Sequence, residues 1–546
     1  MSESPTSALP VDRWSDLTFT NRFTTDLPAD PNPVNHVRQV QGVAYSRVRP
    51  TPVAAPRTLA FSPEVAELLG ISERLCTSPT FAAVLSGNEV PDGADPYAMC
   101  YGGHQFGSWA GQLGDGRAIA LGEVRDAAGG HQTLQLKGAG PTPYSRTADG
   151  RAVLRSSLRE FLCSEAMHHL GVPTTRALSL VATGEPVVRD MLYDGNPRPE
   201  PGAVVCRVAP SFVRFGTFQL PAARGDTALL RALVEATLAH DFPGITGTFE
   251  ERVAGLLDEV VARSALLVAE WMRVGFVHGV LNTDNLSIIG VTIDYGPYGW
   301  LENFDPGWTP NTTDAAGRRY RYGAQPQIVQ WNLLQLAQAL ATLVDDVAPL
   351  QAALDTYVGR YLDHFRVRTV ERLGWDLPRD GDDARIETLL VVLTSSEIDQ
   401  VLFFRDLARV DVDAAADLDV GDAAALDAVL APLADAWYRP EEIVGDVAAG
   451  IGSWLVDWAR RVRIGGLADD ERRRRMDLCN PRFVLRNYLA QEAIDAAEAG
   501  DVTLLHELHD VLRRPYDEQP GKERFAARRP EWARHRAGCS MLSCSS

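Results

Sequence analysis

The chain lacks the features of a secreted, membrane-bound or disulfide-rich protein. Residues 1–17 include Glu3 and Asp12 but no basic start followed by an apolar run, so no secretory signal is visible. No segment is apolar over a length that would span a bilayer. The seven cysteines are scattered without a CxxC pair, which argues against a disulfide framework. We therefore expect a soluble protein of a reducing compartment, the cytoplasm, with no membrane partner.

Positive charge is also scarce. Lys and Arg total 53 against 72 Asp and Glu, which gives the 546 residues a formal net charge of -19. Such a chain has no general attraction for DNA, RNA or anionic lipid, so we expect no nucleic-acid partner and only local basic sites. Hydrophobic residues make up 45% and charged residues 23%, which excludes a disordered, collagen-like or coiled-coil protein.

Four stretches of the chain differ in pattern, and together they predict an α+β fold. Residues 1–95 are interrupted by prolines and are expected to wrap around the rest. Residues 96–224 alternate glycine-rich turns with short apolar runs, which predicts a strand-rich lobe, interrupted by one amphipathic helix at 154–170. Helical periodicity dominates residues 225–375, and residues 376–546 are expected to form a helical C-terminal extension with a cysteine-containing tail.

A glycine-rich turn at 112–117 (QLGDGR) directly precedes the predicted strand at 118–124. Glycines at such a turn let backbone N–H groups approach phosphate oxygens. The same Asp-Gly pattern between extended runs is typical of a plain hairpin, so the turn alone leaves both interpretations open.

Lys137 ends a predicted strand at 133–137. Because Leu134 and Leu136 alternate with it, Lys137 lies on the opposite face of this strand, where an ammonium group can meet phosphates. Glu160 lies away from the Leu/Phe face of the helix at 154–170 and is a candidate partner for Lys137. The alternatives are a strand-end lysine and a glutamate that both lie in solvent.

Arg207 and Arg214 lie among apolar residues in the stretch 206–215 (CRVAPSFVRF). Guanidinium groups in such surroundings usually have an anion or a carboxylate as partner. This pair is therefore the best local anion site of an acidic chain.

The stretch 278–285 (HGVLNTDN) is followed by an apolar run and then by Asp294-Tyr-Gly. Asn285 and Asp294 supply the hard oxygen ligands that Mg²⁺ prefers. Their spacing from His278 resembles the catalytic loop and the metal-binding Asp-Phe-Gly of protein kinases. Val280 stands where a kinase has its catalytic Asp, so Asp284 is the nearby carboxylate that can accept a hydroxyl proton.

These residues follow one another in kinase order across the boundary between the strand-rich and helical regions. Lys137, Glu160, Asn285 and Asp294 keep kinase-like separations. The sequence therefore predicts a two-lobed, protein-kinase-like nucleotide-binding core with a β-rich N-lobe and a helical C-lobe.

Several longer motifs resemble those of the SelO/YdiU (selenoprotein O) family. They are residues 101–107 (YGGHQFG), 113–117 (LGDGR), 136–146 (LKGAGPTPYSR), 278–285 (HGVLNTDN), 293–297 (IDYGP) and 480–487 (NPRFVLRN). With residues 50–70, they cover most of the chain, whereas the Asp-rich region at 380–435 matches only loosely.

The resemblance implies a protein nucleotidyltransferase with a kinase-like fold, which transfers AMP from ATP, or UMP from UTP, to Ser, Thr or Tyr hydroxyls of proteins. The nucleotide is bound in an inverted orientation in this family, pyrophosphate is released, and the substrates include other proteins and the enzyme itself. Mg²⁺ or Mn²⁺ is the implied cofactor.

The family's functional residues can be carried over to matching positions of this chain. Asp284 would be the proton acceptor, Glu160 would pair with Lys137, and Asn285 and Asp294 would hold the metal ion. The implied nucleotide-binding residues are Gly114, Gly116, Arg117, Lys137, Asp149, Gly150, Arg207, Arg214 and Asp294, with the two arginines Arg207 and Arg214 on the terminal phosphate.

Cys544 stands where some members of the family have selenocysteine. Some bacterial members pair this cysteine with one in the activation segment, but the corresponding position here is Pro310. Pairing with Cys539, with Cys479 or between molecules, and an exposed thiol in a mobile tail, are the alternatives for a redox role.

Two other functions compete with nucleotidyl transfer. An ordinary protein kinase is disfavoured by Val280 in the catalytic position. A nucleotide-binding pseudokinase that works as a redox-responsive scaffold is disfavoured by Lys137, Asn285 and Asp294, because a scaffold needs no metal-binding residues.

Overall fold

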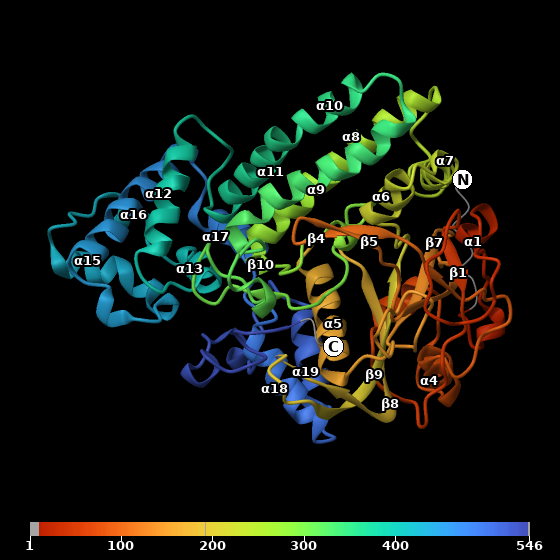
Figure 1. Cartoon of the computed structure of the whole chain (residues 1–546). Coiled ribbons are helices and arrows are strands. Elements are labelled where there is room, and N and C mark those ends of the chain that lie inside the picture. Colours follow the sequence, from red (N-terminus) through yellow and green to blue (C-terminus); the bar gives the residue numbers. More distant parts are fainter. Residues whose placement is uncertain (1–9, 192, 544–546) are drawn as a thin grey trace, which may run out of the picture.

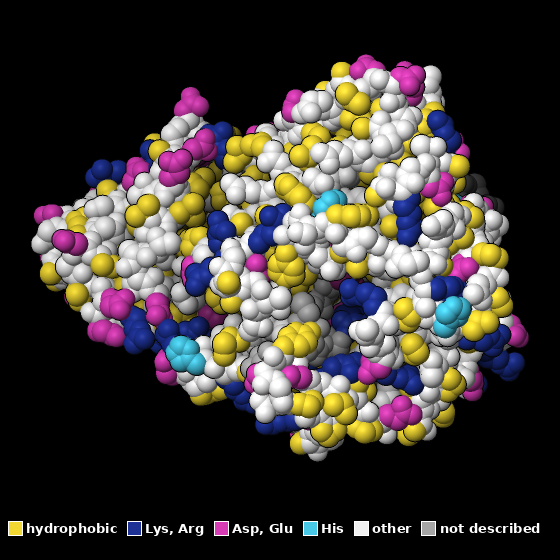
Figure 2. Space-filling model, in the orientation of Figure 1, with side chains coloured by type: hydrophobic (Ala, Val, Ile, Leu, Met, Phe, Trp, Pro, Cys, Tyr) yellow, Lys and Arg dark blue, Asp and Glu magenta, His cyan; other side chains and the backbone are white. Residues whose placement is uncertain are grey.

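The computed structural model describes residues 10–191 and 193–543. A strand-rich region that ends at residue 209 lies beside a helical region, and the C-terminal helices return to the strand-rich side (Figure 1). Basic and acidic side chains are interspersed over the face in Figure 2. Within the described ranges, no helix is both long and apolar enough to cross a membrane.

A seven-stranded antiparallel sheet forms the framework of the N-terminal region. Its strands, in spatial order, are β1 (Tyr45–Arg47), β3 (Tyr97–Met99), β6 (Ala118–Arg125), β7 (His131–Lys137), β9 (Arg198–Ala209), β8 (Arg176–Arg189) and β2 (Arg57–Phe61). The segment before residue 96 therefore supplies both edge strands of the sheet besides covering it.

The alternation of side chains along β7 and its neighbours gives the sheet two buried faces. Leu134 and Leu136 pack in one hydrophobic cluster with the short helices α2 (Pro63–Leu68), α3 (Glu73–Cys76) and α4 (Pro79–Ser86). Helix α5 (Leu154–His169) packs on the opposite face, against β8 and β9. Because both faces are covered, Lys137 is buried, with 5% of its surface exposed, although it ends a strand.

Two strands outside the main sheet form a separate hairpin, β4 (Gly102–Gln105) and β5 (Ser108–Gln112). The turn at 112–117 joins β5 to β6, which pair with different strands and not with each other. The plain-hairpin interpretation of this turn is therefore wrong.

The helical region begins at residue 215. Its first six long helices are α6 (Phe215–Ala223), α7 (Thr227–Asp241), α8 (Phe249–Val274), α9 (Gln325–Leu340), α10 (Ala348–Asp355) and α11 (Tyr357–Arg372). Helix α8 starts at a capping box of Thr248 and Glu251 and ends at Gly275, whose φ of 75° suits a glycine.

Helices α18 and α19 of the C-terminal region return to pack against α5. The helices that follow α11 are α12 (Asp382–Thr394), α13 (Gln400–Leu407), α14 (Val412–Ala416), α15 (Ala423–Leu430), α16 (Gly445–Gly465), α17 (Asp469–Cys479), α18 (Asn487–Glu498) and α19 (Thr503–Leu512). Three further short elements are α1 (Arg22–Asp26) and the paired strands β10 (Phe276–Val277) and β11 (Gly299–Trp300).

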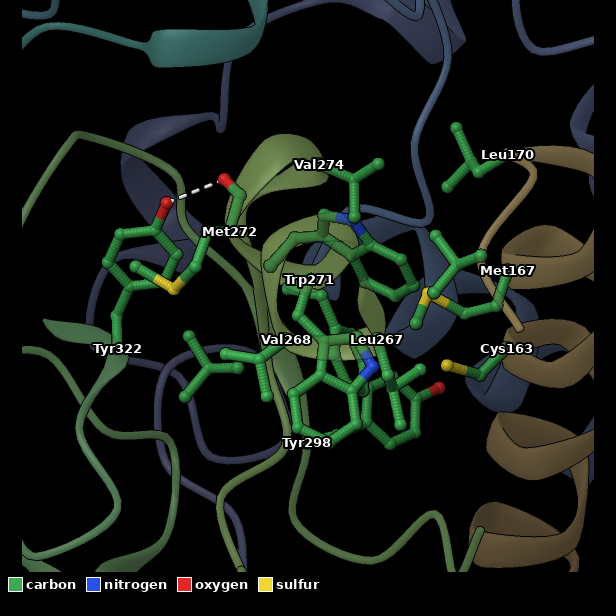
Figure 3. Close-up of a cluster of buried hydrophobic side chains, with 14 of the residues drawn as sticks. Cys163, Met167, Leu170, Leu267, Val268, Trp271, Met272, Val274, Tyr298 and Tyr322 are labelled. Carbon is green, nitrogen blue, oxygen red and sulfur yellow. Dashed lines mark hydrogen bonds between the residues drawn. The ribbon is translucent and has the colours of Figure 1, made fainter. Parts of the chain in front are cut away.

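One continuous hydrophobic core joins the two regions. Figure 3 shows Met167 of α5 and Leu170, the residue after α5, beside Trp271 of α8, with Tyr298 below them. The indole Nε1 of Trp271 donates to the hydroxyl of Thr292 over 2.9 Å. The predicted α+β class is confirmed, with a strand-rich N-lobe and a helical C-lobe in the order found in protein kinases.

Candidate active site

A cavity of about 710 Å³ lies between the sheet and the loops that follow β10. Its lining includes six basic and five acidic side chains, so it is not acidic, although the whole chain carries a net charge of -19. The basic residues are Arg117, Lys137, Arg146, Arg151, Arg189 and Arg207, and the acidic ones are Asp115, Asp149, Asp190, Asp284 and Asp294.

Three predicted glycines lie at positions that leave no room for a side chain. A Cβ on Gly114, whose φ is 113°, would lie 2.6 Å from the ring of Tyr144. A Cβ on Gly150, whose φ is 71°, would lie 2.2 Å from the carbonyl carbon of Gly140. Gly116 also lines the cavity, and a Cβ on it would lie 3.0 Å from the Tyr144 carbonyl oxygen. The backbone therefore comes close to the cavity at these places.

Asp149 and Arg189 form an ion pair of 2.7 Å at the rim of the cavity. The Asp149 carboxylate also accepts the backbone N–H of Arg151. Burial alone would raise the pKa of Asp149, but the hydrogen bond from Arg189 and that backbone bond lower it. Asp149 is therefore ionised and holds the 149–151 turn, with 48% of its own side chain exposed.

The structure brings Lys137 and Glu160 together across the lobe. The ammonium of Lys137 donates to Glu160 over 2.5 Å, and the guanidinium of Arg207 donates to the other oxygen of the same carboxylate. Burial lowers the pKa of Lys137 to about 8, although Glu160 opposes the shift. Burial would raise the pKa of Glu160, but Arg207 and Lys137 hold it below its ordinary value.

Arg207 and Arg214 both bind Asp294, yet they differ in position. The Nη2 of Arg207 lies 2.8 Å from Asp294, and Arg207 lines the cavity. Arg214 binds the other oxygen of Asp294 and donates to the Asp284 carbonyl over 2.8 Å, but it lies behind the cavity wall, stacked on the ring of Tyr101.

Asp294 is the anion of this cluster. Burial would raise its pKa, but Arg214, Arg207 and Lys137 hold the pKa far below its ordinary value. Its φ of 56° is left-handed, which is uncommon for a residue with a side chain. The carboxylate is therefore charged and held by both arginines, and it still lines the cavity.

Asp284 lies in a 3₁₀ turn (Thr283–Asn285) at the floor of the cavity. Its Oδ2 accepts a hydrogen bond of 3.3 Å from the Nε2 of Gln105, whereas its buried Oδ1 has no hydrogen-bond partner among the described residues. Burial raises the pKa of Asp284 to about 6. A buried carboxylate oxygen without a donor is a natural acceptor for a hydroxyl proton.

Asn285 and Asp294 fit a hard divalent cation. The amide nitrogen of Asn285 donates to the Val280 carbonyl over 2.9 Å, so its amide oxygen is the atom that could bind a cation. Asp294 is ionised, and both residues line the same cavity. An amide oxygen and a carboxylate are ligands of the kind that Mg²⁺ takes together with phosphate and water.

His278 supports this loop from below. Its Nε2 lies 2.9 Å from the Ile293 carbonyl oxygen, and its Nδ1 faces the backbone N–H of Val280. The imidazole is fully buried and does not line the cavity, whereas Val280 does. The position that carries the catalytic Asp in a kinase is therefore an apolar part of the wall.

The β4–β5 hairpin was not predicted as part of the site. The backbone N–H of His104 donates to the Thr283 hydroxyl over 2.7 Å, and a Cβ on Gly103 would lie 2.5 Å from the Asp284 carboxylate. The motif at 101–107 was visible in the sequence, but it contains no acid or basic residue other than a histidine, so nothing in it pointed to Asp284.

Asp115 was also not predicted as a residue of the site, because the sequence Gly-Asp-Gly is typical of a turn. Its carboxylate is buried and accepts hydrogen bonds from the Met99 backbone and the Tyr101 hydroxyl. Burial raises the pKa of Asp115. This residue fixes the start of the glycine-rich turn against β3.

Cys544 lies outside the described residues, so the structure gives no position for its thiol. The tail before it is placed: the backbone N–H of Leu542 donates to the Pro310 carbonyl over 2.9 Å, and Thr312 donates back to Leu542 over 2.8 Å. Cys539 is buried and Cys479 partly buried, both as free thiols.

Comparison with known proteins gives one consistent result. A protein-family model described as "Protein adenylyltransferase SelO" matches residues 34–513. The chain is 59% identical over 534 residues to the protein nucleotidyltransferase YdiU of Aromatoleum aromaticum, with 97% of this chain and 99% of that protein covered. The proteins of the same name from Azoarcus sp. and Rhodopirellula baltica are 60% and 56% identical, with the same coverage.

A solved structure of ROP2 from Toxoplasma gondii, titled as a virulence factor with a protein-kinase fold and no enzymatic activity, is 13% identical to this chain. It matches with a TM-score of 0.23 over 55% of this chain and 88% of its own.

Proposed function

Because the chain belongs to the SelO family of protein adenylyltransferases and is thereby an enzyme that transfers nucleotidyl groups, we propose that it moves AMP from ATP to Ser, Thr or Tyr hydroxyls of proteins. UMP from UTP is the alternative donor group. The acceptors are other proteins, and the enzyme itself is a further acceptor. We also propose that the enzyme is located in the cytoplasm.

The observation that carries this proposal is the position of Asp284. Asp284 lines the same cavity as Lys137, Asn285 and Asp294, and its buried Oδ1 has no hydrogen-bond partner among the described residues. Val280 leaves the usual kinase position without a carboxylate. A base placed elsewhere in the site favours attack at a phosphorus other than the γ-phosphorus.

We assign the charged residues of the cavity to the triphosphate. Arg207 binds the terminal phosphate, and Arg214 behind it fixes Asp294 and so supports the same anion. Lys137 and Arg117 neutralise the other phosphates beside the glycines at 114, 116 and 150. Support comes from the six basic side chains that line this cavity in an acidic chain. This inverted placement leaves the α-phosphorus on the side of Asp284.

In the proposed reaction the acceptor hydroxyl gives its proton to the Asp284 carboxylate as its oxygen attacks the α-phosphorus. The new bond is the phosphodiester between the protein oxygen and the α-phosphorus. The bond that breaks joins this phosphorus to the α–β bridging oxygen, which leaves with pyrophosphate and its electron pair. Positioning and charge neutralisation supply most of the rate, as in other transfers at phosphorus.

Asn285 and Asp294 would hold Mg²⁺ or Mn²⁺, which would supply charge neutralisation at the phosphates when bound. Arg214 and Arg207 keep Asp294 ionised and in place for this role.

Labelled ATP distinguishes the three candidate functions. Label in the α-phosphate should enter protein when the enzyme is incubated with ATP and Mg²⁺, and label in the γ-phosphate should not. Protein labelled from the γ-position would instead identify a kinase. ATP binding without label from either position would identify a pseudokinase scaffold. Competition by unlabelled UTP, and replacement of Mg²⁺ by Mn²⁺, then settle the donor and the cation.

A further inference from the structure

The tip of the β4–β5 hairpin presents two large aromatic side chains to solvent next to Asp284. Phe106 is 41% exposed and Trp109 is 39% exposed. The other edge of the same hairpin is bound to the loop that carries Asp284, through the Gln105 and His104 hydrogen bonds described above. An exposed aromatic pair at such a place needs an explanation, because soluble proteins rarely group large apolar side chains at the surface.

The conformation of the tip makes Phe106 more unusual. Phe106 and Gly107 form the two-residue turn, with φ values of 51° and 86°. Such a turn favours Asn or Gly at its first position, because a side chain there is strained. The strained backbone is held by the Phe106 N–H, which donates to the Tyr320 hydroxyl over 2.9 Å and faces the Asn282 side chain at 3.2 Å. Strain kept at a functional site suggests that the aromatic ring is needed there.

Three arginines lie in the segment 318–321, which contacts the hairpin through Arg319 and through the hydrogen bond between Phe106 and Tyr320. Arg319 lies beside the hairpin, since a Cβ on Gly107 would lie 3.3 Å from its Cζ, and Arg319 also stacks over Trp331. Arg318 is exposed, and Arg321 is partly exposed.

The arginine side chains of this segment lack carboxylate partners. None of the three forms an ion pair within 4.0 Å of a described carboxylate, whereas most arginines near Asp284 do. The nearest acidic side chains are used elsewhere: Asp314 accepts backbone N–H groups of Arg319 and Tyr320, and Asp305 accepts that of Gly307. Positive charge without a carboxylate partner is therefore available in the segment that contacts the hairpin tip.

We propose that Phe106, Trp109, Arg318, Arg319 and Arg321, together called the hairpin patch, bind the protein substrate and select hydroxyls flanked by acidic and apolar side chains. This inference rests on the proposed function and names the substrate class of the same site. The occupant is a segment of a protein acceptor. Hydrogen bonds to Thr283 and from Gln105 to Asp284 hold the hairpin against the loop of the proposed base, so a segment bound to the patch lies near Asp284.

The charge of the chain supports the selection of acidic segments by this patch. A chain with a net charge of -19 repels an acidic partner over most of its surface, so local positive charge decides where such a partner can bind. Figure 2 shows dark-blue basic and yellow hydrophobic side chains side by side in the middle of the face where Figure 1 places β4 and β5. Aromatic and arginine side chains are also the residues that most often anchor protein interfaces.

Two fluorescent peptides of equal length test the proposal. Both contain Phe-Ser at the centre, one flanked by Glu and the other by Arg. Their binding to the full chain is measured by anisotropy in the presence of Mg²⁺ and α,β-methylene-ATP, which cannot donate AMP. The acidic peptide should bind at least about tenfold tighter at low salt, and the difference should disappear above roughly 0.5 M NaCl, where the Debye length falls to a few ångströms.

Variants locate the binding to the patch. The double variant Arg318→Glu/Arg321→Glu should weaken the acidic peptide by about tenfold or more and leave α,β-methylene-ATP binding unchanged. Trp109→Ala should weaken both peptides. Arg74→Glu on α3, an exposed arginine far along the chain from this patch, is the matched control and should change nothing. Equal binding of the two peptides, or unchanged binding by the double variant, would overturn the proposal.

The two levels of inference fail separately. Selective binding of the acidic peptide without AMP transfer from ATP would leave the patch standing and refute nucleotidyl transfer. Transfer of AMP to both peptides with equal efficiency, and with no effect of the double variant, would support nucleotidyl transfer and refute the role of the patch.

Discussion

The substitution Gly103→Ala tests whether the β4–β5 hairpin places Asp284. A Cβ at this position would lie 2.5 Å from the Asp284 Oδ1, 2.8 Å from its Cβ and 2.9 Å from its Cγ. Gly103 does not have a positive φ, so an alanine strains no backbone angle there. The three atoms nearest to the added methyl group all belong to Asp284, the proposed base.

The size of the effect follows from the displacement. Ordinary contact begins at 3.4 Å, so Asp284 or the hairpin must move by about 0.9 Å. A misplacement of roughly 1 Å costs about 100-fold in rate, which corresponds to about 2.7 kcal/mol in the activation free energy. Because the residues that we assign to the phosphates lie on β7, on β9 and in the turns at 114–117 and 150, and not on this hairpin, the affinity for ATP should stay the same.

The assay measures kcat for AMP transfer together with the Kd for ATP. Gly359→Ala is the matched control, since a Cβ there meets nothing within 4 Å. Unchanged kcat in Gly103→Ala would refute the role of the hairpin, and a parallel loss of ATP affinity would show that the whole cavity had changed instead.

Three further predictions concern the cavity and the thiols. Asp294→Ala should abolish transfer of α-labelled AMP and lower the Tm, because two buried arginines lose their carboxylate; surviving transfer would exclude Asp294 as a metal ligand. An acyl phosphate of ATP should acylate Lys137 and spare Lys522, the other lysine of the chain, and unlabelled ATP should prevent the reaction; equal modification of both lysines, read by peptide mass spectrometry, would place the phosphates elsewhere. In the native protein at neutral pH, a thiol reagent should react rapidly with no more than one of the seven cysteines, because burial raises the pKa of each described cysteine; several fast thiols would contradict the packing.

The main elements around the cavity were predictable because local pattern decides them. Alternation along β7 placed Lys137 opposite Leu134 and Leu136, and the apolar face of α5 turned Glu160 toward the sheet. Gly171, which follows the C-cap of α5, and Gly275, the C-cap of α8, are visible in the sequence. Such signals lie within one or two turns of chain, so no knowledge of the tertiary structure is needed.

Contacts between distant segments were not predictable from the same signals. Gln105 and Asp284 are 179 positions apart, and a neutral amide gives no indication of an ionic partner. Arg207 and Arg214 look alike in the sequence, since both lie among apolar residues, and only the packing against Tyr101 shows which of them lies behind the wall. The two edge strands contributed by the first 95 residues were missed because short strands between prolines carry little periodicity.

One double-labelled substrate tests the central claim most directly. ATP carrying tritium in the adenosine and ³²P in the γ-phosphate is incubated with the enzyme and Mg²⁺, and protein and small molecules are then separated. We predict tritium on the protein, no ³²P on the protein, and ³²P-pyrophosphate released in equal amount to the bound tritium, with both products lost in Asp284→Asn. ³²P on the protein without tritium would contradict nucleotidyl transfer.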